Sequence, residues 1–323
     1  MINKILSLKN RIVRKLFRNY AFKKMLPKIF MIETVLGCNL HCLECSWGSG
    51  AIKRKAGVMS FDQFKVIADK IKPFAEYIYL IIWGEPLLNP DIFKIINYAS
   101  RFAKTNISTN GQLINQDNAF KLIHSGLTDL IISIDGVTQE VYEKYRRGGD
   151  ISKAINSLTL LNKINKSSGN KVNIIPQFIV FKHNERELPA FERLCSNLGL
   201  KPYFKEPYFQ KNSKLENSSL PQFKRNRSYS SDLTSLKKEV KKCIDVYKAM
   251  NILLDGSVVP CCYDDQGKII FGNIFKQDVL EIWNGPISFN FRSNVHKGNP
   301  PQFCLDNCLL YNYDPNNIRK VKK

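Results

Sequence analysis

Three cysteines of this chain, Cys38, Cys42 and Cys45, lie within eight residues with the spacing C-x3-C-x2-C. They follow directly after an apolar stretch at residues 30–36. A site that binds one metal ion through four thiolates lacks a ligand here, whereas a [4Fe–4S] cluster held by three cysteines keeps one iron free for another molecule. The spacing therefore predicts a [4Fe–4S] cluster with an open iron. The alternatives are a zinc site with a distant fourth ligand and three unrelated buried thiols.

A second group of cysteines lies near the C-terminus and comprises Cys243, Cys261, Cys304 and Cys308. Four thiols from two well-separated segments can complete a closed site, either for zinc or for a second cluster. The segment Leu254-Asp255-Gly256-Ser257 has the composition of a hairpin turn, which would carry the chain back towards this site. Cys262, directly after Cys261, is a spare thiol.

Length and composition are those of a folded protein that binds metal in a reducing compartment. The chain has 323 residues, enough for one large domain or about two, and 44% of them are hydrophobic. Most of the nine cysteines are grouped, and no signal-peptide pattern is present, so metal binding is favoured over disulfides. No apolar run approaches the ~20 residues of a membrane span. We therefore expect a cytoplasmic protein.

The net charge of +21 is partly concentrated at the N-terminus. Residues 2–20, within a first segment at 1–27, have the period of a basic amphipathic helix. Such a helix either packs on the protein's own core or lies peripherally on the inner face of an anionic membrane. Basic proteins also attract nucleic acid, but no nucleic-acid-binding module is recognisable, so no specific nucleic-acid partner is predicted.

Between residues 30 and 205, strand patterns alternate with helix patterns. Strands are predicted at 30–36, 77–82, 106–109, 130–134, 172–181 and 201–205, and helices at 60–73, 91–102, 116–124, 139–145, 151–166 and 185–198. Because nearly all these strands are apolar and most precede a helix, the pattern predicts a parallel sheet covered by helices. In such folds ligands bind at the carboxyl ends of the strands. Polar turn residues follow several strands there, at 84–85, 109–111 and 135–136.

Two further segments differ in composition. Residues 207–240 are rich in Lys, Asn and Ser with little periodicity, and they are predicted to be a linker or a lid. Residues 313–323 form a basic tail.

Taken together, these motifs resemble the radical S-adenosylmethionine (SAM) enzymes that carry a C-terminal SPASM or shorter twitch-type auxiliary-cluster domain. The resemblance covers roughly residues 28–312. It rests on the C-x3-C-x2-C motif, Gly84-Glu85-Pro86 (with Trp83 in place of a glycine), Ser108–Gly111, Ser133–Gly136, the arginine-bearing segment 142–149 and the C-terminal cysteines. It implies an α/β fold, with a partial (β/α)6 TIM-like barrel at 28–206 and a small α+β auxiliary-cluster domain at 241–312.

The resemblance also implies cofactors and their contacts. SAM would bind the iron left open by Cys38, Cys42 and Cys45, and a flavodoxin- or ferredoxin-type donor would supply the electron. The implied SAM contacts are Gly84 and Glu85 at the amino group, Ser133 and Asp135 at the ribose, Arg146 at the carboxylate, and Asn110. The four C-terminal cysteines would hold one auxiliary [4Fe–4S] cluster as an electron acceptor, and Cys262 could donate a hydrogen atom.

The substrate is less defined than the chemistry. A small polar molecule, such as a carbohydrate or cyclitol, that undergoes oxidation is the leading prediction. The alternatives are peptide modification and epimerisation by the same radical chemistry. A non-catalytic iron–sulfur electron-transfer protein and a zinc-stabilised nucleic-acid binder are alternatives from other classes.

Overall fold

The computed structural model describes residues 22, 24–205, 207, 243 and 245–308, and the structural statements below concern these residues. Nine strands form one sheet in the order β11-β10-β9-β1-β4-β5-β6-β7-β8. The strands are β1 (Ile29–Ile32), β4 (Tyr77–Tyr79), β5 (Lys104–Thr109), β6 (Asp129–Ser133), β7 (Asn173–Ile179), β8 (Tyr203–Lys205), β9 (Ala249–Ile252), β10 (Ser257–Val259) and β11 (Gly272–Asn273). A separate antiparallel pair consists of β2 (Val35–Leu36) and β3 (Gly57–Val58).

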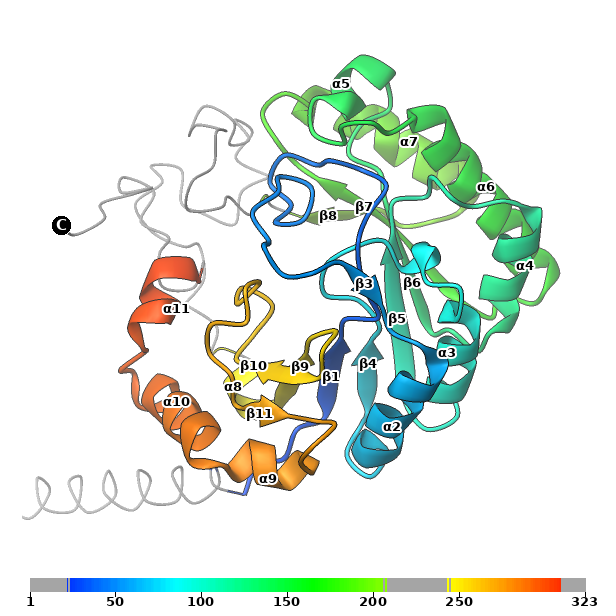
Figure 1. Ribbon diagram of the computed structural model, residues 1–323. Coiled ribbons are helices and arrows are strands. Elements are labelled where there is room, and N and C mark those ends of the chain that lie inside the picture. The colour runs from blue at the N-terminus through cyan, green and yellow to red at the C-terminus, as the bar shows by residue number, and fades with distance from the viewer. Residues whose placement is uncertain (1–21, 23, 206, 208–242, 244, 309–323) are drawn as a thin grey trace, which may run out of the picture.

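Strands β1 and β4–β8 are all parallel, and helices connect them. The helices are α2 (Phe61–Ile71), α3 (Ile92–Ala99), α4 (Gln116–His124), α5 (Gln139–Glu143), α6 (Ile151–Ser167) and α7 (Leu188–Leu198), with 3-10 turns η1 (Pro86–Leu88) and η2 (Glu185–Glu187). The sheet is curved, and α2, α3, α4, α6 and α7 lie on its outer side (Figure 1). The predicted α/β fold with helices covering a parallel sheet is confirmed.

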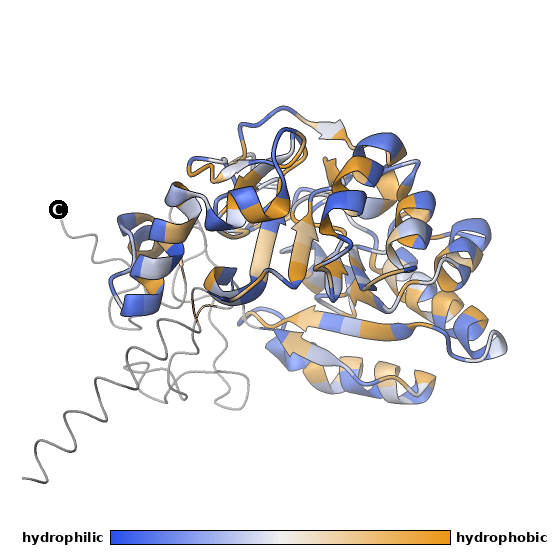
Figure 2. Ribbon diagram, turned by 90° about the horizontal axis from the view of Figure 1, so that it is seen from below, coloured by the Kyte–Doolittle hydropathy of each residue, from blue (hydrophilic) through white to orange (hydrophobic). Residues whose placement is uncertain are grey.

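One face of this sheet packs against the helices. Alternate residues of the strands, such as Phe30, Ile78 and Ile107, are fully buried in the main hydrophobic core. The helices turn apolar sides towards them, as the mixed orange and blue of each helix in Figure 2 indicates. The predicted capping box opens α2, where the Ser60 hydroxyl accepts from the Gln63 backbone N–H at 3.2 Å.

The opposite face, which we call the inner face, is largely polar. The register of the strands places on it Ile29, Met31, Tyr77, Tyr79, Lys104, Asn106, Ser108, Asp129, Ile131, Ser133, Asn173, Ile175, Gln177, Ile179, Tyr203 and Lys205. Near the start of the strands, the Tyr77 hydroxyl and the Asn173 amide both donate to the Asp129 carboxylate. This network joins three strands at the amino end of the inner face. Because these side chains bond to one another, the polar groups of the inner face that are available to a ligand lie nearer the carboxyl end of the strands.

The predicted strand at 30–36 is interrupted. It consists of β1, which ends at Ile32, and β2, which begins at Val35. Between them the Glu33 N–H donates to the Ile252 carbonyl at 2.9 Å and the Thr34 hydroxyl donates to the Leu80 carbonyl at 2.9 Å. These two bonds end the pairing of β1 with its neighbours. After residue 34 the chain pairs with β3 and no longer with β4.

The C-terminal part continues the same sheet. Strand β9 pairs in parallel with β1, and β10 and β11 extend the sheet in antiparallel fashion. Helices α8 (Asp245–Lys248), α9 (Val279–Asn284), α10 (Pro286–Lys297) and α11 (Gln302–Asn307) flank these strands (Figure 1). The β9–β10 hairpin confirms the predicted turn, in which Gly256 has φ +81°.

Replacing Gly256 by alanine is expected to destabilise the fold by about 1–3 kcal/mol. A left-handed φ is unfavourable for alanine, and its Cβ would lie 2.3 Å from the Phe275 ring. Gly148→Ala is the matched control, because Gly148 has φ +79° but no atom within 4 Å of the added carbon. Chemical denaturation of both variants checks this. Equal losses of stability would show that the contact with Phe275 contributes nothing.

Several predictions fall outside the described residues. These are the helix at 2–20, nearly all of the linker at 207–240, and the tail at 313–323. None of the described helices combines the length and the continuous apolar sequence that a membrane span requires.

Candidate iron–sulfur and SAM site

The loop that carries Cys38, Cys42 and Cys45 lies against the segment that follows β6. The N–H groups of His41 and Leu43 donate to the carbonyls of Arg147 and Tyr145, at 3.0 and 3.3 Å. The three cysteines pack in one cluster with Leu40, Leu43, Tyr145, Ile179 and Phe181. The two segments, a hundred residues apart in the sequence, therefore hold the three thiols at the carboxyl end of the sheet.

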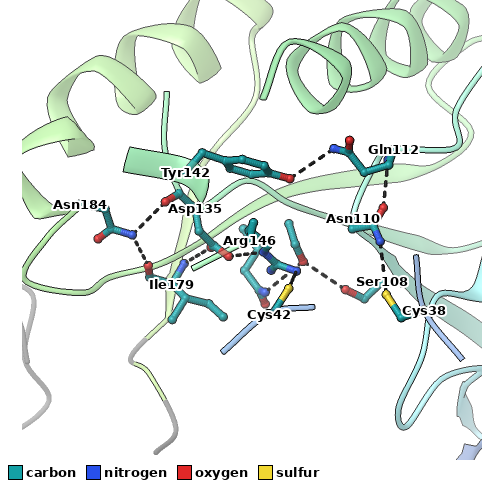
Figure 3. Close-up of polar contacts among 12 residues, drawn as sticks. Cys38, Cys42, Ser108, Asn110, Gln112, Asp135, Tyr142, Arg146, Ile179 and Asn184 are labelled. Carbon is teal, nitrogen blue, oxygen red and sulfur yellow. Dashed lines mark hydrogen bonds and ion pairs between the residues drawn. The ribbon is translucent and has the colours of Figure 1, made fainter. Parts of the chain in front are cut away.

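Hydrogen-bond donors approach two of the sulfur atoms. The Leu40 N–H and the Asn110 side-chain amide approach Cys38 Sγ at 3.4 and 3.6 Å. The Arg146 guanidinium approaches Cys42 Sγ at 3.8 Å (Figure 3). Donors and positive charge near sulfur stabilise its thiolate form and tune the potential of a cluster. This environment suits ligand thiolates.

Two of the three thiols, those of Cys38 and Cys42, are neutral without a metal. Burial raises the pKa of Cys38 to about 12 and that of Cys42 to about 11, and for both thiols the neighbouring Cys45 adds to the rise. The three sulfurs are therefore close enough to interact. Among the described residues, no three His, Cys, Asp or Glu side chains converge as ligands of a single metal ion. A cluster does not require such convergence, because each cysteine binds a different iron. This donor set fits a [4Fe–4S] cluster.

Gly84 and Glu85 tie the end of β4 to the cysteine loop and to β5. Gly84 has φ +104°, and a Cβ there would lie 2.7 Å from the carbonyl oxygens of Val35 and Gly37. The Glu85 N–H donates to the Gly37 carbonyl at 2.8 Å. The buried Glu85 carboxylate accepts from the Thr109 hydroxyl at 2.8 Å, the Asn110 N–H at 2.8 Å and, more weakly, the Leu87 N–H at 3.2 Å.

Replacing Glu85 by glutamine is expected to destabilise the protein by about 1–3 kcal/mol, because the new amide presents donors to groups that are themselves donors. Glu187→Gln is the control. The Glu187 carboxylate also accepts from a backbone N–H and a threonine hydroxyl, but it is only half-buried and water can replace a lost bond. Denaturation curves of both variants measure the difference, and a loss for Glu187→Gln as large as that for Glu85→Gln would contradict the expectation.

The same residue gives a pH dependence. Burial raises the pKa of Glu85 above its ordinary value, although three donors act in the opposite direction. The folded state therefore keeps the proton to a higher pH than the unfolded chain does. Stability is lost as the pH rises from the ordinary glutamate pKa through the raised one. This part of the slope should be absent from stability–pH curves of the Glu85→Gln variant.

Asp135 and Arg146 form a buried ion pair. Asp135 Oδ2 accepts from Arg146 Nε at 2.6 Å, and Oδ1 accepts from the Ile179 N–H at 2.6 Å. Burial acts to lower the pKa of Arg146, but the Asp135 carboxylate, together with Cys42, Tyr145 and Tyr142, keeps that pKa well above the usual value. Figure 3 shows Arg146 between Asp135 and Cys42. Two residues predicted to contact different parts of SAM are thus joined to each other.

Asn184 fixes Asp135 from behind and has no counterpart among the predicted site residues. Its amide donates to the carbonyls of Asp135 and Ile179, each at 2.9 Å (Figure 3). Ser133 lies on the inner face, where its hydroxyl is 3.5 Å from both the Ser108 hydroxyl and the Gln177 amide. Gly84, Glu85, Asn110, Ser133, Asp135 and Arg146 all lie at or just beyond the carboxyl ends of the strands.

A second buried ion pair, between Arg54 and Glu33, was not expected from the sequence. Both guanidinium Nη atoms donate to the Glu33 carboxylate at 2.7 Å, and Nε donates to the Asp265 carbonyl at 2.7 Å. The Leu254 N–H donates to the same carboxylate at 3.0 Å. Arg54 therefore links the end of the cysteine loop to β1 and to the C-terminal part of the chain. No local motif predicts these contacts, because the partners lie 21 to 211 residues away.

The C-terminal cysteines are also brought together. Cys243, Cys304 and Cys308 pack in one cluster with Val246 and Val295. Cys261 follows β10, and burial together with neighbours that include Cys243 raises its pKa well above the usual value. Burial likewise raises the pKa of Cys262 to about 12, with Cys308 and Asp245 among its neighbours and Lys205 acting in the opposite direction. Both adjacent thiols thus lie near the group.

The sequence profile described as "Radical SAM superfamily" matches residues 32–193, half of the chain. The chain belongs to the radical SAM superfamily. The profile of the SPASM iron–sulfur cluster-binding domain matches residues 243–309. In this superfamily member the two matched domains imply a [4Fe–4S] cluster, SAM and an auxiliary cluster, as predicted.

The names of the relatives of this radical SAM protein indicate different activities. It is 32% identical over 168 residues to the mycofactocin maturase MftC of Mycobacterium ulcerans, covering 52% of this chain and 44% of the relative. It is 28% identical over 179 residues to the AdoMet-dependent heme synthase of Methanosarcina barkeri, covering 55% and 49%. The chain thus matches less than half the length of these relatives.

A solved structure supports the fold. Streptococcus suis SuiB bound to the precursor peptide SuiA has a TM-score of 0.65 with this radical SAM protein, at 16% identity, covering 90% of this chain and 72% of that one. SuiB and the other radical SAM structures that resemble this chain have a partial TIM barrel, so the predicted barrel is confirmed.

Proposed function

We propose that this protein is a radical SAM enzyme that oxidises a small polar substrate, such as a carbohydrate or cyclitol, with the auxiliary cluster as electron acceptor. The observation that carries the proposal is the position of the three-cysteine loop at the carboxyl end of a sheet whose inner face is polar. When bound, the first cluster and SAM supply a 5′-deoxyadenosyl radical that removes a hydrogen atom from the substrate.

The inner face supports a polar substrate. Near the carboxyl end it offers hydroxyls and an amide from Tyr79, Ser108, Gln177 and Tyr203. Burial, and then the charges of Asp129 and Tyr203, raise the pKa of the Tyr79 hydroxyl, which therefore stays a donor at neutral pH. Neutral donors and acceptors with few charges suit a molecule rich in hydroxyl groups.

The chain's own residues bind and orient the cofactor. Cys38, Cys42 and Cys45 would hold the cluster, and the backbone beside Gly84 would contact the amino group of SAM. The Asp135–Arg146 pair acts as one unit, in which Asp135 orients the guanidinium and Arg146 keeps a free Nη2 donor for a carboxylate. Ser133 and Asn110 supply further polar contacts. We assign the auxiliary cluster to Cys243, Cys261, Cys304 and Cys308, and Cys262 lies beside it as a candidate hydrogen donor.

Peptide modification is the second candidate. It is favoured by the relative named mycofactocin maturase, to which this chain is 32% identical over 168 residues. The likeness to SuiB, at 16% identity, supports only the shared fold. A peptide would need to reach the same inner face from the carboxyl end of the strands, because the Tyr77–Asp129–Asn173 network occupies the other end.

Anaerobic reconstitution with iron and sulfide tests the function. We expect about eight irons per chain, for two clusters, and formation of 5′-deoxyadenosine from SAM after reduction. Neutral and phosphorylated inositols and hexoses should accelerate this formation, whereas short peptides should not. Acceleration by peptides alone would favour the second candidate. Colourless, zinc-loaded protein without SAM cleavage would contradict both.

We further propose a cytoplasmic location and a low-potential flavodoxin- or ferredoxin-type electron donor. The segment 2–20 is proposed as a peripheral contact with anionic membrane. Co-sedimentation of the full chain and of a variant without residues 1–20 with anionic liposomes tests the last point, and equal binding would contradict it.

A further inference from the structure

Arg292, on α10, is a buried cation with no anionic partner among the described residues. Its side chain is 3% exposed, and no carboxylate lies within ion-pair distance. The two Nη atoms donate to the carbonyls of Trp283 and Val246, at 2.9 and 3.3 Å. The guanidinium stacks 3.7 Å from the centre of the Trp283 ring, and its Nε has no partner within the described part of the chain.

This charge is unusual because a guanidinium remains protonated inside the protein. Burial lowers the pKa of Arg292, but only to about 10, so the side chain is positive at neutral pH. An isolated buried charge is costly, by several kcal/mol, unless an anion lies nearby. Two carbonyl dipoles and an aromatic ring offset part of that cost. The part of the free-energy cost that these groups do not offset points to an anion in the folded, metal-loaded protein.

The position of Arg292 identifies that anion. Its neighbours on α10, Phe291 and Val295, pack in the cluster that contains Cys243, Cys304 and Cys308. Val246, which accepts from Arg292, belongs to the same cluster. A cavity with room for about one water molecule is lined by Arg292, Asp245 and Pro260, the residue before Cys261. Arg292 therefore lies on the helix that packs against the cluster of the proposed ligand thiols.

Asp245 does not replace this anion. It lines the same cavity, but its Oδ1 accepts from the Asn251 amide at 3.1 Å, and no ion pair joins Asp245 to Arg292 in the described structure. Its carboxylate lies among the thiols and, when ionised, adds negative charge there. Four thiolates around an iron–sulfur core carry a net negative charge, which grows by one unit when the cluster is reduced.

We infer that Arg292 is the countercharge of the auxiliary cluster and raises the reduction potential of that cluster. The inference rests on the auxiliary cluster of the proposed function. A fixed positive charge in a low-dielectric interior stabilises the reduced form more than the oxidised form. A raised potential makes the cluster a better acceptor for the electron that a substrate radical loses, and this gives Arg292 a positioning and tuning role in oxidation.

The test uses the full chain with Cys38, Cys42 and Cys45 all replaced by alanine, so that only the auxiliary cluster is reconstituted. Redox titration followed by electron paramagnetic resonance gives its midpoint potential without any turnover. Arg292→Met and Arg292→Gln should lower the midpoint, and Arg292→Lys, which keeps the charge, should retain most of it. Arg101→Met, which removes an exposed charge near the end of α3, is the control and should change nothing.

Each outcome bears on a different claim. Neutral variants that hold the cluster at an unchanged midpoint would overturn the inference and leave the auxiliary cluster standing. A protein that binds no iron before Arg292 is changed would contradict the auxiliary cluster itself, and the inference with it. The C-terminal domain of Arg292→Met could fail to fold. In that case the Arg292→Gln and Arg292→Lys variants give the same test, because both keep a donor for the Trp283 carbonyl. The difference between their midpoint potentials then isolates the effect of the charge.

Discussion

Replacement of Cys42 by alanine is expected to remove about four irons per chain and to reduce SAM cleavage to the background level. Cys42 is 5% exposed, and its sulfur receives the Arg146 guanidinium. A cluster with only two cysteine ligands is not retained. The same result is expected for Cys38→Ala and Cys45→Ala. Iron analysis and 5′-deoxyadenosine formation after reduction measure it.

Cys304→Ala is the matched control for this prediction. Cys304 is also buried, but it belongs to the C-terminal thiol group. Its replacement should lower the iron content by a similar amount yet leave reductive SAM cleavage in place. Cleavage that survives in Cys42→Ala, or that disappears equally in both variants, would contradict the assignment of SAM to the first site.

Replacement of Arg54 by methionine is expected to lower the free energy of unfolding by about 3–5 kcal/mol, because it leaves the Glu33 carboxylate buried without its cation. Glu33 is fully buried, and within the described structure the only other donor to its carboxylate is the Leu254 N–H. Arg54→Lys should recover only part of this loss. A lysine cannot make both bonds to Glu33 and also reach the Asp265 carbonyl.

Lys65→Met provides the comparison on the surface. Lys65 pairs with Asp69 at 2.8 Å across one turn of α2, but both side chains are half exposed. Its loss should change stability far less than the loss of Arg54, because water and salt screen an exposed pair. Thermal or chemical unfolding of the metal-free chains measures all three variants. Similar small losses for Arg54→Met and Lys65→Met would show that the Arg54–Glu33 link is not a structural brace.

Local patterns were sufficient for most of the secondary structure between residues 60 and 205, and they indicated the first metal site. Helix α4 has the predicted bounds, and α2 begins at the predicted capping box, because caps and apolar periods act over a few residues. The C-x3-C-x2-C spacing also acts locally, since one loop supplies all three thiols. The polar motifs that follow the strands indicated the other residues of the site, because parallel strands all end at the same edge of the sheet.

The tertiary structure alone decided how charges and sheet edges meet. The pairing of β9 with β1 makes the C-terminal part an extension of the barrel sheet, and no local pattern encodes that neighbour. In the sequence Asp135 follows a strand and Arg146 follows a helix, yet folding turns them towards each other. Arg54 and Glu33 likewise meet only through packing. Arg292 is a buried cation without an anionic partner in the described part of the chain only because its side of α10 packs against the protein. Burial and long-range contact determine what a charge costs, and the sequence by itself specifies only its presence.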